Sequence, residues 1–150
     1  MKQNKILLVA VASLLILFST TSWVSPKPLS ATRRAVTITG WYDFSTFPNT
    51  LGTFSTTGAL TISGTSTMDV NPIMANGTLV RAHCVVVLTP SDGSGTITIH
   101  QECVYKTPMP QGRWEVVSGT GAYTNLKGNG PLTMPMQGGL FGEAMTGSIY

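Results

Sequence analysis

The amino-acid sequence predicts an all-β fold, a closed antiparallel barrel of about eight strands. Short segments in which apolar and polar residues alternate recur along the chain, and alternation of this kind is typical of strands with one buried face. Turn-forming residues separate the segments, and no long stretch repeats apolar residues at helical spacing. The last alternating segment runs up to Tyr150, so the strand it forms needs a partner. Pairing with the first strand would close a barrel and remove both sheet edges, with an open sandwich as the alternative.

The first 31 residues are predicted to be a secretory signal peptide and a linker. Lys2 and Lys5 precede an uncharged apolar run over 6–18, and small and polar residues follow it. The run is shorter than the roughly 20 residues that a membrane span needs. Cleavage is predicted after Ser22 or after Ala31, with an uncleaved membrane anchor as the alternative. The mature chain is therefore predicted to be exported, to the periplasm or the extracellular space, and not to span a membrane.

A single domain over 32–150 is expected, and each of its strands is predicted from a separate alternating segment. The segments cover 35–43, 52–70, 78–89, 96–106, 113–119, 130–136 and 142–150. The second segment is one strand or two, because Gly58 and Gly64 interrupt it.

The charge of the mature chain argues against a nucleic-acid partner. The net charge of +3 matches the three lysines that lie before residue 32. From residue 32 onward the sequence holds six basic and six acidic residues, so no basic stripe remains to neutralise phosphates.

The segments 78–89 and 96–106 form the clearest predicted hairpin, joined by turn residues over 90–95. The expected register pairs Cys84 with Gln101 and places Cys103 diagonally across from Cys84, on one apolar face. A shift by one pair would set the cysteines directly opposite each other. Two cysteines in an exported protein usually form a disulfide, so a Cys84–Cys103 disulfide is predicted, with two buried free thiols as the alternative.

The opposite face of this hairpin carries the cluster with the clearest acid–base chemistry, His83, His100 and Glu102. These side chains are candidates for general acid–base catalysis. If the cysteine face is the barrel interior, however, the two histidines lie in solvent beside a weak ion pair. The sequence leaves open which face points inward. No metal site is predicted, because further ligands are lacking, and no cofactor is predicted.

The glycine-rich segment "SGTGAYTNLKGNG", residues 118–130, is predicted to turn a corner between two late strands. It lacks the strand-to-helix context of a phosphate-binding loop. With the strand and tryptophan before it, the segment resembles an element of the allene oxide cyclase and dirigent-type barrels, which are calycin-like. The matching positions are Gly119, Thr120, Gly121, Tyr123 and Gly128. The resemblance implies an eight-stranded barrel, as in small secreted bacterial members of that superfamily, and a shaped apolar cavity. It carries no catalytic residue onto this chain.

The sequence therefore favours an exported barrel that binds a small apolar molecule in its mouth. Trp41, Trp114 and Tyr123 are the candidate ligand-binding residues, although the default role of a buried tryptophan is core packing. A cyclase- or isomerase-type enzyme is the first alternative, and a filled barrel that serves only as a surface or interaction module is the second. The sequence does not decide whether the protein is an enzyme, and it leaves the oligomeric state open.

Overall fold

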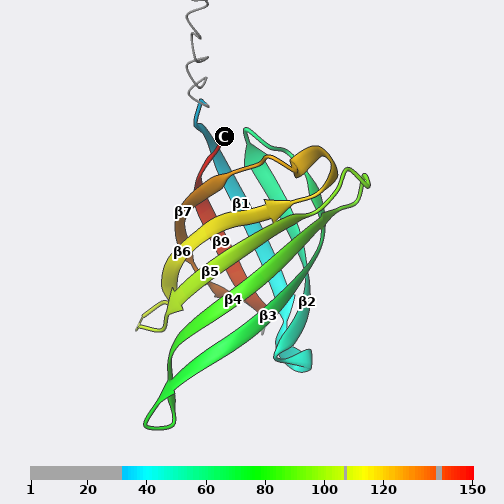
Figure 1. Ribbon diagram of the computed structural model, residues 1–150. Helices are drawn as coiled ribbons and strands as arrows, with labels where there is room; N and C mark the ends of the chain where they lie inside the picture. Colours follow the sequence, from blue (N-terminus) through cyan, green and yellow to red (C-terminus); the bar gives the residue numbers. More distant parts are fainter. Residues whose placement is uncertain (1–31, 107, 138–139) are drawn as a thin grey trace, which may run out of the picture. The chain divides into compact units, whose positions relative to one another are not determined.

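The computed structural model describes residues 32–106, 108–137 and 140–150, so the predicted signal peptide and linker lie outside the described residues. Nine strands and two short 3-10 helices form the described part (Figure 1). The strands are β1 (Arg34–Asp43), β2 (Asn49–Gly58), β3 (Ser63–Ala75), β4 (Thr78–Pro90), β5 (Ile97–Val104), β6 (Gln111–Gly119), β7 (Gly128–Thr133), β8 (Met136–Gln137) and β9 (Leu140–Ile149). The 3-10 helices are η1 (Phe44–Thr46) and η2 (Gly121–Tyr123). Among these residues, no helix has the length and apolar character needed to cross a bilayer.

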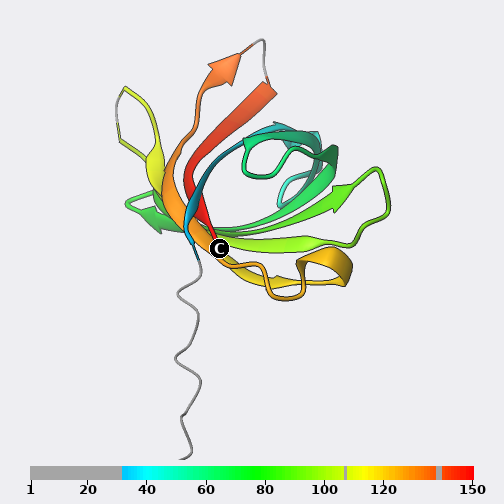
Figure 2. The same ribbon diagram turned by 90° about the horizontal axis from the view of Figure 1, so that it is seen from above.

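Eight of the strands close into an antiparallel barrel, as the sequence predicts. Each strand from β1 to β7 pairs with its neighbour in the chain, and β9 pairs with both β7 and β1. The closing β1–β9 ladder runs from Arg34 opposite Ile149 to Tyr42 opposite Phe141. The view along the barrel shows the resulting ring of strands (Figure 2). The two-residue strand β8 pairs only with β9 and lies outside the ring.

The second alternating segment forms two strands, and the latter is longer than the sequence analysis predicts. β3 continues through Pro72 to Ala75 and returns as β4 through a two-residue turn. At this turn Asn76 and Gly77 both have positive φ, 50° and 76°. An Asn-Gly pair with positive φ at both positions is the preferred connection for a tight hairpin. This turn signal was missed in the sequence, which explains the underestimated length of β3.

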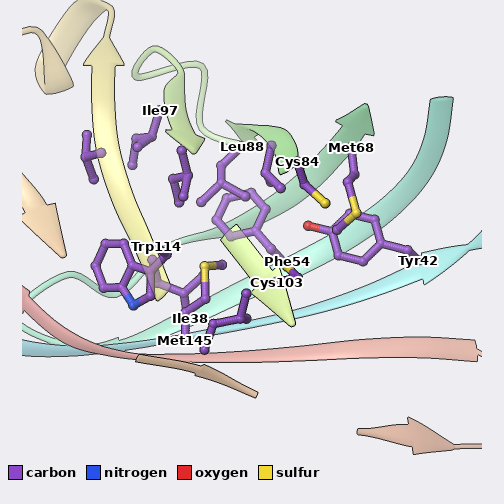
Figure 3. Packing of buried hydrophobic residues seen from close by; sticks show 14 of the residues in the cluster. Ile38, Tyr42, Phe54, Met68, Cys84, Leu88, Ile97, Cys103, Trp114 and Met145 are labelled. Carbon is purple, nitrogen blue, oxygen red and sulfur yellow. The ribbon is translucent and has the colours of Figure 1, made fainter. Parts of the chain in front are cut away.

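The barrel interior is built from the alternating faces of the strands. The predicted register of the β4–β5 hairpin is confirmed, with Cys84 opposite Gln101 and His83 opposite Glu102. The face that carries the cysteines points inward, so the structure decides the question that the sequence leaves open. Figure 3 shows how inward side chains from opposite walls meet in the middle of the barrel. The labelled members are Ile38, Tyr42, Phe54, Met68, Cys84, Leu88, Ile97, Cys103, Trp114 and Met145.

The predicted disulfide is not formed. Cys84 and Cys103 are both free and buried. The register explains this result, because Cys84 faces Gln101 and Cys103 faces Ala82. The two cysteines are therefore diagonal neighbours on the inner face and not a directly opposed pair.

The glycine-rich segment turns a corner at one end of the barrel, as predicted. Gly121 has a φ of 57°, a left-handed conformation that favours glycine, and it approaches the backbone of Ser94 in the β4–β5 turn too closely for a side chain. Tyr123 folds back over this end, and its hydroxyl lies 2.7 Å from the Ser94 hydroxyl. We call this end, which carries η2 and the β4–β5 turn, the closed end.

A candidate ligand site at the barrel mouth

The opposite end of the barrel, which we call the mouth, contains an apolar pocket of about 320 Å³. Its lining residues are Phe44, Phe47, Val70, Pro72, Leu79, Tyr105 and Phe141. Phe44 directly follows β1 and Phe141 is the second residue of β9, and their ring centroids are 4.8 Å apart. The closing ladder between β1 and β9 brings the two rings together. The pocket lies at the opposite end of the barrel from the glycine-rich corner.

Exposed apolar side chains gather at the mouth. Nine large hydrophobic residues are exposed in the described part of the chain, and six of them lie on the strand ends and loops around the mouth. These six are Phe47, Leu51, Ile73, Met74, Met109 and Leu140. Scattered exposed hydrophobic residues are normal, but apolar groups concentrated around a pocket are typical of a ligand or interaction site.

Four polar side chains lie inside the barrel below this pocket. Tyr42, Ser66, Gln101 and Glu143 come from β1, β3, β5 and β9, and each is at most 2% exposed. We call them the inner polar cluster. Inward positions follow one another at every second residue of a strand, so Glu143 lies one inward step below Phe141. Tyr42 is the last inward residue of β1, two positions before Phe44 in η1. The cluster therefore forms a layer next to the mouth and not at the closed end.

Glu143 is the only acidic residue with a buried side chain in the described part of the chain. Gln101 donates a hydrogen bond of 2.5 Å from Nε2 to Glu143 Oε2 and contacts Met145 Sδ with the same nitrogen. Burial raises the pKa of Glu143 to about 7, although the polar contacts with Gln101 and Tyr42 partly oppose this rise. A carboxyl group with a pKa near neutrality can both donate and accept a proton.

Tyr42 occupies space that two inward-facing glycines provide. A Cβ at Gly40 would lie 2.9 Å from Cε2 of the Tyr42 ring, and one at Gly52 would lie 2.7 Å from Cδ1. The ring therefore lies close against the barrel wall, where larger residues would displace it. Its hydroxyl points into the interior (Figure 3) and is close to Ser66 and Glu143. Burial and the charge of Glu143 raise the pKa of Tyr42 well above its usual value, so the hydroxyl stays protonated.

The inner polar cluster has hydrogen-bonding capacity that its own members do not use. Among the described residues, Tyr42 OH, Ser66 Oγ, Gln101 Oε1 and Glu143 Oε1 are buried without a partner in hydrogen-bond geometry. Buried polar atoms without partners cost about 1–3 kcal/mol each, so most proteins avoid them. Four such atoms in one layer next to a pocket mark this layer as a place where a polar group can bind.

The two thiols connect the mouth to the inner polar cluster. Tyr105, in the pocket wall, is affected electrostatically by both Cys103 and Cys84, and burial together with these thiols raises the pKa of Tyr105 to about 12. A hydrogen bond with Cys84 and burial raise the pKa of Cys103 strongly. A thiol held in its protonated form is a poor nucleophile, so Cys103 acts as a small apolar packing group.

The sequence-predicted acid–base residues lie on the outer surface of the barrel. His83, His100 and Glu102 all have exposed side chains on the face opposite the cysteines. Glu102 pairs with Arg113, which donates from Nε at 2.8 Å and approaches with NH2 at 2.6 Å. His100 and Glu102 do meet in an open polar groove of about 510 Å³, which Arg113, Glu115 and Asn129 also line. The structure thus brings these two residues together, but outside the barrel and away from the mouth.

The three aromatic residues predicted to bind ligand do not line the mouth pocket. Trp41 lies on the outer face of β1, next to Gly142 of the paired strand. Trp114 points into the barrel, and its Nε1 donates to the carbonyl oxygen of Thr146 at 3.0 Å (Figure 3). Tyr123 covers the closed end. Trp114 therefore has the core-packing role that is the default for a buried tryptophan.

The sequence analysis missed the inner polar cluster, although a signal was present. In the last strand the inward positions 141, 143, 145, 147 and 149 are Phe, Glu, Met, Gly and Ile, an apolar series with a single acid. In β5 the inward series contains Gln101 between Ile99 and Cys103. A single polar residue on an apolar face indicates a buried polar group that needs a partner.

No metal site is indicated within residues 32–106, 108–137 and 140–150, where no three histidine, cysteine, aspartate or glutamate side chains are grouped suitably. Comparisons of the chain with protein-family models, with curated proteins and with solved structures found no match. The eight-stranded antiparallel barrel is consistent with a calycin-like architecture. The resemblance to allene oxide cyclase and dirigent-type barrels therefore stays a prediction.

Proposed function

We propose that this protein is an exported barrel that binds a small, mainly apolar molecule in its mouth. The observation that carries the proposal is the apolar pocket whose wall includes the contacting rings of Phe44 and Phe141, together with Tyr105. Its volume of about 320 Å³ lies at the lower end of the range found for ligand sites, which are mostly apolar with a few polar groups. The proposed export rests on the N-terminal sequence, and the proposed kinship with allene oxide cyclase-like barrels rests on the glycine-rich segment.

The location of the pocket supports binding more than simple packing. Phe47 is 50% exposed at the rim, so a large apolar surface remains in contact with water. Burying such surface under a ligand is favourable by about 25 cal/mol per Å². At the closed end Tyr123, by contrast, is buried and makes a hydrogen bond with Ser94. A ligand is therefore expected to enter at the mouth.

A fluorescence titration with N-phenyl-1-naphthylamine tests the proposal. The probe emits strongly only in an apolar environment, so saturable enhancement on the exported protein is expected. Phe141→Ala should weaken the binding of the probe at least tenfold, because it removes one of the two facing rings. Leu140→Ala is the matched control, since Leu140 is the adjacent residue of β9, is exposed and lies outside the pocket lining.

Two results would contradict the proposal: no saturable enhancement with the parent protein, or equal weakening by both substitutions. Circular dichroism of each variant shows whether it retains the barrel. If Phe141→Ala does not fold, Phe44→Leu provides the second test, because it keeps an apolar side chain while removing the ring contact.

An enzyme of the cyclase or isomerase type is the second candidate, and Glu143 favours it. A buried carboxyl group with a raised pKa, next to an apolar pocket, suits proton transfer to a molecule held there. In this alternative Glu143 replaces the exposed His83, His100 and Glu102 as the acid–base residue. Turnover of a bound ligand that Glu143→Gln abolishes, while binding persists, would favour the enzyme over the carrier.

A further inference from the structure

We propose that the ligand of the mouth carries a hydroxyl group, which Tyr42, Gln101 and Glu143 bind at the base of the mouth. This inference rests on the proposed function and specifies its ligand. It concerns the inner polar cluster. An apolar ligand does not need these polar side chains, and burying them without hydrogen-bond partners costs free energy.

The position of the cluster suits the end of an elongated molecule. Phe44 and Phe141 line the pocket. Glu143 is the next inward residue after Phe141 on β9, and Tyr42 is the last inward residue of β1, two positions before Phe44. One inward step along a strand corresponds to about 6–7 Å. A molecule whose apolar body lies in the pocket, against the two phenylalanine rings, would therefore place its far end at the layer of the cluster.

The free hydrogen-bonding atoms match a hydroxyl group. Gln101 uses its Nε2 on Glu143 and Met145, so its Oε1 is available as an acceptor. The Tyr42 hydroxyl keeps its proton and can donate. A hydroxyl group on the ligand can donate to Gln101 Oε1 and accept from Tyr42 at the same time.

Charged head groups fit less well. The groups that face the cluster are the thiol of Cys103 and the sulfurs and carbons of the core, and no lysine, arginine or histidine in the described chain is buried beside them. A carboxylate would be buried next to Glu143 without a cation. An ammonium group would require Glu143 to be ionised and would lose its own hydration. A hydroxyl group binds either form of Glu143, since it donates to a carboxylate and accepts from a carboxylic acid.

Displacement of the fluorescent probe by two isomers tests the inference. 1-Octanol and 1-methoxyheptane have the same atoms, but only the alcohol can donate a hydrogen bond. We expect 1-octanol to displace N-phenyl-1-naphthylamine at about tenfold lower concentration than the ether, as one additional buried hydrogen bond predicts. Octylamine and octanoate should displace it less well than 1-octanol.

Two tyrosine variants locate the hydroxyl site. Tyr42→Phe removes a buried hydroxyl without hydrogen-bond partners and leaves the ring against Gly40 and Gly52, so we expect it to fold and to lose most of the preference for the alcohol. Tyr105→Phe removes the hydroxyl from the pocket wall and should keep the preference.

The outcomes separate this inference from the proposed function. Equal displacement by the two isomers, or tighter binding of octylamine or octanoate, would overturn the inference while binding in the mouth stands. Loss of the preference in Tyr105→Phe but not in Tyr42→Phe would place the hydroxyl at the rim and would also overturn it. If neither isomer displaces the probe and the probe itself does not bind, the proposed function fails.

Discussion

The two ends of the barrel are stabilised in different ways. At the closed end, hydrogen bonds link the β4–β5 turn to the glycine-rich corner. Thr120 N donates to Thr96 O at 2.9 Å, Ala122 N donates to Ser94 O at 2.9 Å, and the Thr96 and Thr120 hydroxyls lie 2.9 Å apart. At the mouth backbone hydrogen bonds such as Gly142 N to Pro135 O, at 2.8 Å, also occur, but the side chains that line the pocket are mainly apolar, with Phe44 packed on Phe141.

This difference indicates which end can open. Hydrogen bonds are directional, so the closed end has one preferred arrangement. Apolar contacts tolerate small shifts and are re-formed by any apolar partner of similar shape. Segments with fewer buried contacts open at lower free energy than the rest of a fold. A ligand that replaces apolar contacts at the mouth would therefore disturb the barrel less than one that enters at the closed end.

The largest expected effect comes from the core that supports the closed half. Trp114→Ala should lower the free energy of unfolding by about 3–5 kcal/mol, because Trp114 is fully buried and packs next to Gly128. Trp41→Ala, on the outer face of β1, is the control and should cost clearly less. Urea unfolding of both variants measures the difference. If both variants lost the same free energy of unfolding, the placement of Trp114 inside the barrel and Trp41 outside it would be contradicted.

The next largest effect is the pH dependence of the free energy of unfolding that Glu143, near the mouth, causes. Folding raises the pKa of Glu143 from an ordinary value of 4.5 to about 7, mainly through burial. The folded protein therefore binds this proton more tightly than the unfolded chain does. The contribution of Glu143 to stability is complete below about pH 4.5 and is lost as pH rises towards 7, by about 3 kcal/mol in total.

A comparison with Glu143→Gln isolates this contribution. The variant lacks the titrating group, so its free energy of unfolding minus that of the parent should increase between pH 4.5 and 7 and then level off. The exposed Asp43 and Asp92 are present in both proteins and cancel in the difference. Tyr42 and Cys103, which face Glu143, stay protonated in this interval because their pKa values are raised by burial and, for Cys103, first by its hydrogen bond with Cys84. A difference that does not change with pH would contradict the burial of Glu143.

A smaller effect is expected for matched tyrosines at the two ends. Tyr123→Phe removes the hydrogen bond with Ser94 and should lower the free energy of unfolding by about 1 kcal/mol. Tyr105→Phe, at the mouth, should change the free energy of unfolding by less than about 0.5 kcal/mol. The reason is that the Tyr105 hydroxyl makes no side-chain hydrogen bond among the described residues. Thermal or urea unfolding of the pair measures this. A larger loss at Tyr105 would reverse the contrast between the ends.

The smallest effect is expected for a reducing agent. Because Cys84 and Cys103 are free thiols, dithiothreitol should leave the free energy of unfolding unchanged within about 0.5 kcal/mol. A disulfide across this hairpin would instead contribute about 2–4 kcal/mol, which reduction would remove. Thiol titration should find two reactive groups after denaturation and almost none before it, because both side chains are buried.

Much of the fold follows from the sequence, whereas the candidate site does not. Alternation along 78–89 and 96–106 predicts the β4–β5 register, since side chains change face at every residue. Closure of β1 on β9 follows from the need to pair a terminal strand. The pocket depends on which rings meet after closure, and Phe44 and Phe141 are almost a hundred residues apart in the chain. The burial of Glu143 does not follow from its own strand, because the other members of the inner polar cluster come from β1, β3 and β5.

The ladder between β1 and β9 also determines when the barrel can close during folding. Arg34 pairs with Ile149, so the barrel closes only through its first and last strands. Bringing such distant segments together is entropically costly and slow, and proteins rich in distant contacts fold slowly. A chain that emerges from its amino end, at the ribosome or through a translocation channel, keeps an open sheet until β9 appears. Until then one edge of β1 and one edge of β7 lack their neighbour in the sheet and stay open to pairing with other strands.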